Sequence, residues 1–224
     1  MKIKENIVII ISAIIVLFSV CIDLMPNMQL DTKFKLVIYI FSMIIVWIDM
    51  KLKNRKIIKG IYLENNRKKY LTVIFIIYTI LIMTLLFLDT NYGRYNYTQN
   101  IKFLSKEHFN YYSNFIPFKT IYGYIKRFNM INTSIIVTNL LGNIIAFAPY
   151  GILVPIIFKE KFNNIKSFAL LMVVIVLAVE CIQFVTKRGS FDIDDLILNV
   201  LGAVMFFEIM KFEPIKKFVN EIIK

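Results

Sequence analysis

Six long apolar runs are the feature that most constrains how this chain can fold. Helices of about 20 apolar residues cross a bilayer, and local thinning of the bilayer accommodates shorter ones. A helix also satisfies its backbone hydrogen bonds within one segment, which an open sheet cannot do in lipid. The sequence therefore predicts an all-α membrane bundle of about six transmembrane helices. The runs cover residues 7–22, 34–48, 71–88, 135–158, 168–185 and 193–210.

Composition points to the same class of protein. Hydrophobic residues make up 58% of the chain and charged residues 19%, whereas soluble proteins average about 45–50% and about 25%. These values exclude soluble globular, disordered, collagen-like and coiled-coil chains. Both cysteines, Cys21 and Cys181, lie inside apolar runs, so no disulfide framework is expected.

Basic residues between the runs predict the orientation, because cytoplasmic loops of membrane proteins carry an excess of Lys and Arg. Such residues are frequent in segments 1–6, 51–70, 159–166 and 211–224. Two predicted helices separate each segment from the next, so both termini are placed in the cytoplasm. The net charge of +12 then reflects loops beside anionic lipid, and no nucleic-acid partner is expected. Six Lys or Arg in the predicted outer segment 89–133 oppose the trend.

The chain divides into parts of different character. Residues 1–88 hold three plain hydrophobic spans, which are predicted to be membrane-anchoring helices. No small-x-small cleavage site follows the first span, so we interpret it as a retained transmembrane helix and not as a cleaved signal peptide. Residues 89–212 combine an aromatic outer loop with three helices that carry polar residues, and residues 213–224 form a cytoplasmic tail. Because Tyr favours membrane interfaces, we expect the outer loop to form short amphipathic helices. Its His108 is expected to be exposed.

Polar residues recur at one depth in the last three predicted helices. At 1.5 Å per residue, they lie in the outer half of the bilayer, and their i,i+3 and i,i+4 spacings place neighbours on one helix face. We therefore predict an outward-facing polar pocket, in which Arg188 is the nearest strong cation for the acids. The predicted pocket residues are Asn139, Asn143, Glu180, Gln183, Arg188, Asp192, Asp195 and Asn199.

Two interpretations of these residues remain open. Amides within membrane spans often join helices by hydrogen bonds, and Asp192 is well placed to cap the sixth helix. Alternatively, the cluster is a functional pocket. Glu180 favours this second interpretation, since it caps no helix and an ionisable residue within a span costs about 2.5–3.5 kcal/mol on insertion scales.

The ordered set of motifs resembles the VanZ-like family. The resemblance implies a small bacterial multi-spanning protein of the cell membrane, in a family whose namesake is associated with teicoplanin resistance, and it brings no settled biochemical activity. It extends from the outer-loop motif that contains Pro117 and Phe118 to the sixth helix. The residues that carry it are Phe115-Ile116-Pro117-Phe118-Lys119-Thr120-Ile121, Asn139, Asn143, Phe147, Pro149, Gly151, Glu180, Gln183, Arg188, Asp192, Asp195, Asn199 and Gly202.

Three functions fit such a pocket. A non-enzymatic envelope protein would hold the head of a lipid-linked cell-wall precursor or a glycopeptide drug, with membrane lipid around it. An intramembrane enzyme would use Glu180 as a general base, with Asp192 and Asp195 on a divalent cation. A transporter would also carry an acid within a span. We favour the first function, the non-enzymatic envelope protein. No metal, cofactor or catalytic residue is assigned. Whether the chain is an enzyme stays open.

Overall fold

The computed structural model describes residues 6–25, 28–55, 60–89, 105–130 and 132–223, which are almost entirely helical. The chain forms two compact units, which are described separately. The first comprises Met1–Gly93 with Lys216–Lys224, and the second comprises Arg94–Ile215. The all-α fold class expected from the sequence is confirmed.

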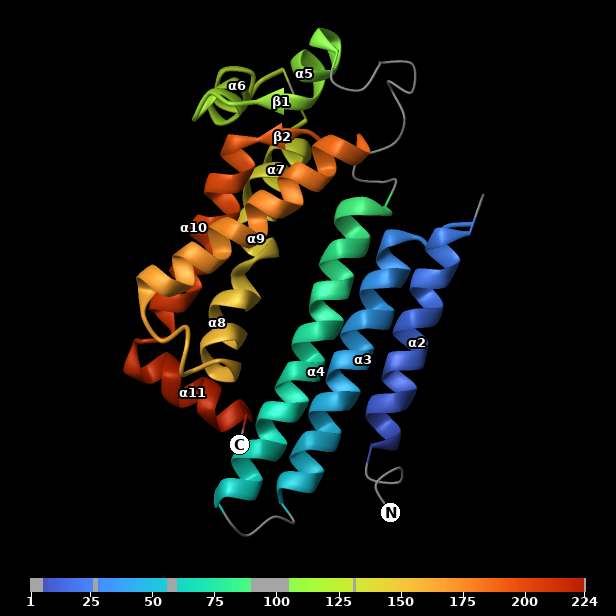
Figure 1. Cartoon of the computed structure of the whole chain (residues 1–224), viewed down its shortest axis with the longest axis vertical. Coiled ribbons are helices and arrows are strands. Elements are labelled where there is room, and N and C mark those ends of the chain that lie inside the picture. The colour runs from blue at the N-terminus through green and yellow to red at the C-terminus, as the bar shows by residue number, and fades with distance from the viewer. Residues whose placement is uncertain (1–5, 26–27, 56–59, 90–104, 131, 224) are drawn as a thin grey trace. The chain divides into compact units, whose positions relative to one another are not determined.

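Three long helices build the first unit: α2 (Ile7–Leu24), α3 (Thr32–Asn54) and α4 (Gly60–Phe87), shown from blue to green in Figure 1. Helix α3 packs against both α2 and α4. Apolar side chains on the outer faces of α2 and α3 remain exposed, as lipid-facing residues would. At the end of helix α11 (Glu213–Ile223), the indole N–H of Trp47 donates to the carbonyl oxygen of Ile222 at 3.0 Å.

A buried ion-pair network joins the three helices of the first unit. The ammonium of Lys35 is fully buried and lies 3.0 Å from Asp23 Oδ2 and 3.1 Å from Asp89 Oδ2. The hydroxyl of Thr32 also donates to the Asp89 carboxylate, at 2.7 Å. From the sequence, this part of the chain was predicted to hold only plain hydrophobic spans. Lys35 meets Asp23 and Asp89 only because the fold brings the ends of the three helices together.

The second unit contains α5 (Lys106–Tyr112), α6 (Lys119–Lys126), α7 (Thr133–Ala146), α8 (Ala148–Ile157), α9 (Ile165–Thr186) and α10 (Ile193–Ile209). Helix α10 packs against α7, α8 and α9. Helices α5 and α6 agree with the short helices expected in the outer loop. His108 on α5 is fully buried between rings, with its centroid 4.4 Å from that of Phe184, so the prediction of an exposed residue was wrong.

The fourth apolar run forms two consecutive helices. Helix α7 ends and α8 begins at Phe147, where the backbone leaves the helical conformation (φ −106°, ψ 3°). Pro149 follows in the first turn of α8. A proline is tolerated there because the first N–H groups of a helix have no partner within the helix. A break is therefore expected just before this residue.

Two glycines allow α7 and α8 to approach α10 closely. A Cβ atom added at Gly202 would overlap the carbonyl oxygen of Ile144. One added at Gly151 would overlap the carbonyl oxygen of Ala203 and lie 2.7 Å from the backbone nitrogen of Phe207. Small residues allow such backbone-to-backbone packing between helices in membranes.

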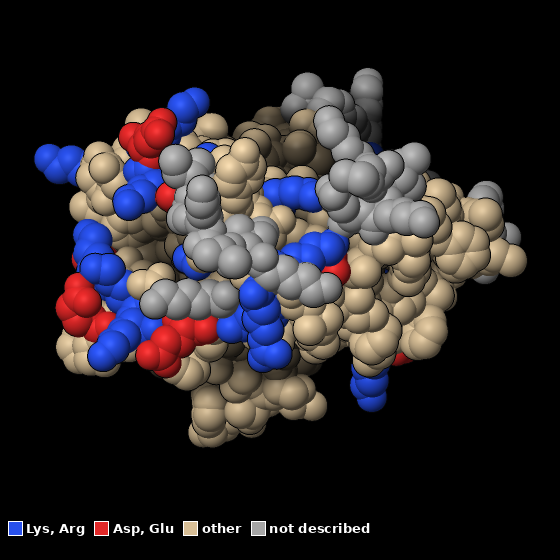
Figure 2. All heavy atoms as spheres, turned by 90° about the horizontal axis from the view of Figure 1, so that it is seen from below, with Lys and Arg blue, Asp and Glu red and all other residues tan. Residues whose placement is uncertain are grey.

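Within the described part of the chain, four helical segments are long and apolar enough to cross a membrane: Ile7–Leu24, Tyr62–Phe87, Thr133–Ile157 and Ile165–Thr186. The second and sixth predicted spans are also helical, but α3 carries charged residues toward both ends and α10 has 17 residues. Figure 2 shows Lys and Arg side chains spread over the face seen from below. The count of six spans and the cytoplasmic position of both termini stay predictions.

Candidate functional site

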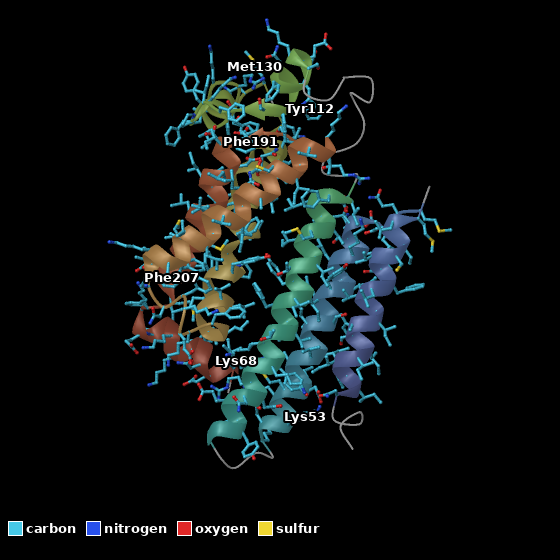
Figure 3. The ribbon with its side chains drawn as sticks, viewed as in Figure 1. Lys53, Lys68, Tyr112, Met130, Phe191 and Phe207 are labelled. Atoms are coloured by element: carbon cyan, nitrogen blue, oxygen red, sulfur yellow. The ribbon has the colours of Figure 1, made fainter. Side chains whose placement is uncertain are left out.

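A short parallel strand pair connects the outer loop to the start of α10. Strand β1 (Ser113–Asn114) pairs with β2 (Phe191–Asp192), with Asn114 opposite Asp192. Figure 3 labels Tyr112, just before β1, and Phe191, within β2, at the same end of the second unit. Residues almost 80 positions apart in the chain are thereby brought together.

Asp192 accepts hydrogen bonds from three elements. It is the N-cap of α10, and its Oδ1 accepts from the backbone N–H of Asp194 at 2.9 Å. The same oxygen accepts from the Asn114 amide at 2.9 Å, and Oδ2 accepts from the Thr120 hydroxyl at 2.6 Å. The capping role considered from the sequence is therefore present, together with contacts to β1 and α6.

Asp194 fixes the beginning of α6. Its fully buried carboxylate accepts backbone N–H groups of Phe118, of Thr120 at 2.7 Å and of Ile121 at 3.2 Å. A carboxylate is favoured there by the positive end of the helix dipole. Phe118 precedes the helix with a left-handed backbone (φ 64°), which is uncommon for a residue with a side chain. The three hydrogen bonds hold the outer loop in this conformation.

Glu180 and Gln183 both lie buried near the C-terminal end of α9. Oε2 of Glu180 accepts the backbone N–H of Asp192 at 3.0 Å. Gln183 packs against the turn at Gly189, where an added Cβ would lie 3.0 Å from its side chain. Glu180 therefore attaches α9 to the strand that leads into α10.

A further pair of residues joins α7 to α10. The side-chain amide of Asn143 donates to Oδ1 of Asp195, and the Asn199 amide donates to the backbone oxygen of Asp195 at 2.8 Å. Asn139, in contrast, is exposed and donates to the carbonyl of Ile135 within its own helix, at 2.7 Å. Asn143 and Asp195 thus meet across helices.

Arg188, the cation of the predicted pocket, lies in the turn after α9. Arg188 is exposed, and its backbone N–H donates to the carbonyl of Gln183 at 3.1 Å. Half-buried Tyr124 on α6 lies near the acids: burial raises the pKa of its hydroxyl, and the negative charges of Asp195 and Asp192 raise this pKa further. Burial and then the charge of Lys187 lower the pKa of His108.

The network shows what the carboxylates do in this structure. Glu180, Asp192 and Asp194 accept backbone N–H groups, which fasten loop, strand and helix to one another. Among the described residues, no group of three or more His, Cys, Asp or Glu is placed to hold a metal ion. The outer loop meanwhile leaves Phe115, Ile116 and Phe118 each 60% exposed.

Sequence reasoning missed three members of this network: Asn114, Thr120 and Asp194. Asp194 is not among the predicted pocket residues, although it lies in the first turn of α10. One signal was available in the sequence, because Asp192 and Asp194 are two residues apart and only one of them can cap α10. The carboxylate of the other is then available for a different contact. Thr120 lies inside the outer-loop motif, and Asn114 directly precedes that motif.

The fold and the site define a helical membrane protein whose outer loop is fastened by carboxylates to the helices beneath it. The VanZ/LLP1 family matches residues 75–213, well over half of the chain, so the chain belongs to this family. It is similar to Protein VanZ of Enterococcus faecium, with 32% identity over 99 residues. That alignment covers 40% of the chain and 60% of the relative, less than two thirds of the relative's length. No solved structure matches.

Proposed function

We propose that this chain is a multi-pass protein of the bacterial cell membrane that binds or shields the polar head of a lipid-linked or cell-wall-related ligand. It would thereby contribute to resistance against glycopeptides of the teicoplanin type. Membership of the VanZ/LLP1 family supports the membrane and envelope part of this proposal. The ligand and the protective role rest on the site.

The observation that carries the proposal is the fastening of the outer loop by Asp192 and Asp194. These contacts hold the exposed side chains of Phe115 and Phe118 close to the start of α10, where the ring centroids of Phe115 and Phe191 lie 5.1 Å apart. Arg188, three residues before Phe191, is exposed as well. A ligand that is part lipid and part polar head offers matching chemistry to such a surface. The loop is held in one conformation, which reduces the entropy lost on binding.

The proposal includes six spans with both ends of the chain in the cytoplasm. Helices α3 and α10 then cross the membrane together with the four longer segments. Reporter fusions after Asn65 should be cytoplasmic and those after Lys126 external. An external reporter at Asn65 would contradict this topology, even if the binding function were correct.

Drug susceptibility tests the function directly. Expression of the chain in a susceptible strain that lacks its own copy should raise the teicoplanin concentration needed to stop growth. Arg188→Gln should remove this protection at unchanged protein abundance, whereas Lys159→Gln, an exposed lysine elsewhere in the second unit, should keep it. Equal protection by both variants, or none from the parent, would contradict the proposal.

A Glu180→Gln variant separates two roles for the buried acid. Glutamine keeps an oxygen that can accept the N–H of Asp192, but it removes the charge. If protection is kept, Glu180 serves as a hydrogen-bond acceptor that shapes the site. If protection is lost at normal abundance, the negative charge itself is required, as a direct contact with a ligand or a catalytic role would demand.

A further inference from the structure

Helix α11 has one apolar face and one polar face. Its apolar residues are spaced three and four positions apart, so they lie on the same side of the helix. They are Ile215, Phe218, Val219, Ile222 and Ile223. Polar residues of the same turns, such as Lys217 and Asn220, lie on the opposite side. A helix with this division of residues needs a surface against which its apolar face can lie.

The protein itself covers only part of this apolar face. Ile223 is buried, with 6% of its surface exposed, whereas Phe218 is 63% exposed and Ile222 is 39% exposed. Phe218 and Ile222 are four positions apart, so they are neighbours on the helix surface. We call these two residues the uncovered edge of α11. This edge is available to a partner outside the chain.

The C-terminal end of α11 is attached to α3 within the first unit. The indole N–H of Trp47 donates to the carbonyl oxygen of Ile222, and the ammonium of Lys51 donates to the carbonyl oxygen of Glu221, both at 3.0 Å. The Lys51 ammonium also lies 5.5 Å from the centroid of the Trp47 ring. The last carbonyl groups of a helix have no partner within it, so these two donors stabilise the end of α11.

The two attachment points lie where α3 changes from apolar to charged sequence. The apolar run 34–48 ends one residue after Trp47, and Lys51 and Lys53 lie in the last turn of the helix. Ile48 is 44% exposed, as a lipid-facing residue would be. In a helix that crosses a membrane, such a change marks the boundary between hydrocarbon and water, where Trp is enriched. The uncovered edge of α11 is therefore held close to this boundary.

This end of the molecule is also positively charged. Residues 216–223 contain Lys216, Lys217 and Glu221, and Lys51 adds a positive charge beside the last carbonyl groups of α11. Lysine residues near a membrane surface attract anionic phospholipids. The charge of this end is therefore complementary to an anionic membrane surface.

We propose that α11 lies in the membrane–water interface and binds anionic phospholipid there. Phe218 and Ile222 reach into the acyl chains, and Lys217 on the polar side lies at the level of the phosphate groups. Amphipathic helices that lie in the plane of a membrane interface have this arrangement of residues. The inference goes beyond the proposed function and shares with it only the passage of α3 through the membrane.

Spin labels test the position of α11. A nitroxide is attached to Phe218→Cys, Ile222→Cys or Asn220→Cys in the full chain, after Cys21 and Cys181, which are both free, have been changed to serine. The proteins are placed in nanodiscs of phosphatidylcholine and phosphatidylglycerol, in which both membrane faces are open to the solution. Oxygen, which concentrates in lipid, should reach the labels at 218 and 222 more than the label at 220. A water-soluble nickel chelate should show the reverse order, and equal access of this chelate at all three positions would overturn the interfacial position.

The fluorescence of Trp47 tests the preference for anionic lipid in the unmodified chain. Trp47 is the single tryptophan of the protein and contacts the end of α11, so a brominated lipid quenches its fluorescence only when it lies close to this site. Quenching by brominated phosphatidylglycerol is compared with quenching by brominated phosphatidylcholine in the same nanodiscs. We expect phosphatidylglycerol to be preferred roughly fivefold, as one basic residue near the membrane surface would produce. Equal affinity for the two lipids would overturn the anionic-lipid assignment.

A matched pair of variants locates this preference. Lys217→Gln should lower it to roughly twofold or less, because a positive charge beside the lipid phosphate is removed. Lys159→Gln removes an exposed lysine of the second unit and should quench like the parent. An unchanged preference in Lys217→Gln would overturn the role of that residue.

These measurements are independent of the proposed function. If the label at 218 is in water but the chain still protects cells from teicoplanin, the proposed function stands and the position of α11 is wrong. If the labels and the quenching behave as expected but the parent gives no protection, this inference stands and the proposed function fails.

Discussion

The side-chain amide of Asn143 on α7 donates a hydrogen bond to the carboxylate of Asp195 on α10, 52 residues further along the chain. Asn139, one helical turn earlier, is exposed and bonds only to the carbonyl of Ile135 among the contacts described for it. The two asparagines looked equivalent in the sequence. In the structure, one joins two helices and the other lies on a surface.

This difference predicts different effects of alanine at the two positions. Asn143→Ala removes a donor from a half-buried carboxylate, which should lower the free energy of unfolding by about 1–3 kcal/mol. Asn139→Ala should change it by less than about 0.5 kcal/mol, as is usual for a surface substitution. Thermal unfolding of both variants in the same detergent measures the effect. Equal stability would mean that the contact to Asp195 adds nothing.

Asp194 should control the order of the outer loop. Asp194→Ala leaves the N–H groups of Phe118, Thr120 and Ile121 without their acceptor, and loss of a buried charged acceptor costs about 1–3 kcal/mol. Amide hydrogen exchange at these three residues should accelerate, while exchange in α9 changes little. Glu107→Gln, an exposed acid on α5, is the control. Unchanged protection in Asp194→Ala would show that other contacts hold the loop.

Two glycines give a matched pair for the packing of α10. Gly202→Ala places a methyl group on the carbonyl oxygen of Ile144, and such overpacking costs about 1–3 kcal/mol. A Cβ at Gly142 would meet nothing within 4 Å, so alanine there should stabilise helix α7 by about 0.5–1 kcal/mol. The two variants should therefore shift the unfolding temperature in opposite directions. A tolerated Gly202→Ala would disprove the close approach of the two backbones.

Lys35 should be indispensable to the first unit. Lys35→Met leaves the carboxylates of Asp23 and Asp89 buried without their cation, and removal of one partner from a buried ion pair costs about 3–5 kcal/mol. We expect little folded protein to accumulate in the membrane. Lys33→Met removes an exposed lysine two residues earlier and should accumulate normally. Similar abundance of the two variants would rule out a stabilising role for the network.

His108 predicts a dependence of stability on pH. Burial and then the charge of Lys187 lower its pKa from the ordinary 6.5, and the nearby Phe184 backbone opposes this shift. The folded state thus prefers neutral imidazole. The stabilisation is complete above about pH 6.5, where the unfolded chain is also neutral, and is lost as pH falls through the folded-state pKa. The unfolding temperature of the parent should fall over this range.

Replacement of the imidazole isolates its contribution to that change. His108→Phe keeps an aromatic ring beside Phe184 and cannot take up a proton, so its unfolding temperature should depend less on pH below about 6.5. Identical pH profiles of parent and variant would assign the dependence to other groups.

The sequence by itself determined that the chain is helical and where its long helices lie. Apolar runs such as 7–22 and 168–185 are long enough to require a lipid-like environment, and backbone hydrogen bonds in lipid favour helices. The C-terminal end of α9 and the N-terminal end of α10 could also be recognised as polar, because Glu180 and Asp195 stand out within apolar surroundings. These conclusions depend on local composition alone.

Only the tertiary structure decided what the polar groups contact. Asp194 meets the start of α6 more than 70 residues away, and Lys35 meets Asp89 across 54 residues. Burial of His108 likewise required α5 to fold onto α9. A hydrogen bond depends on distances and directions that are set when helices pack, and residue type limits only the possible partners. The sequence could therefore identify candidate groups, whereas helix packing decided which groups each of them contacts.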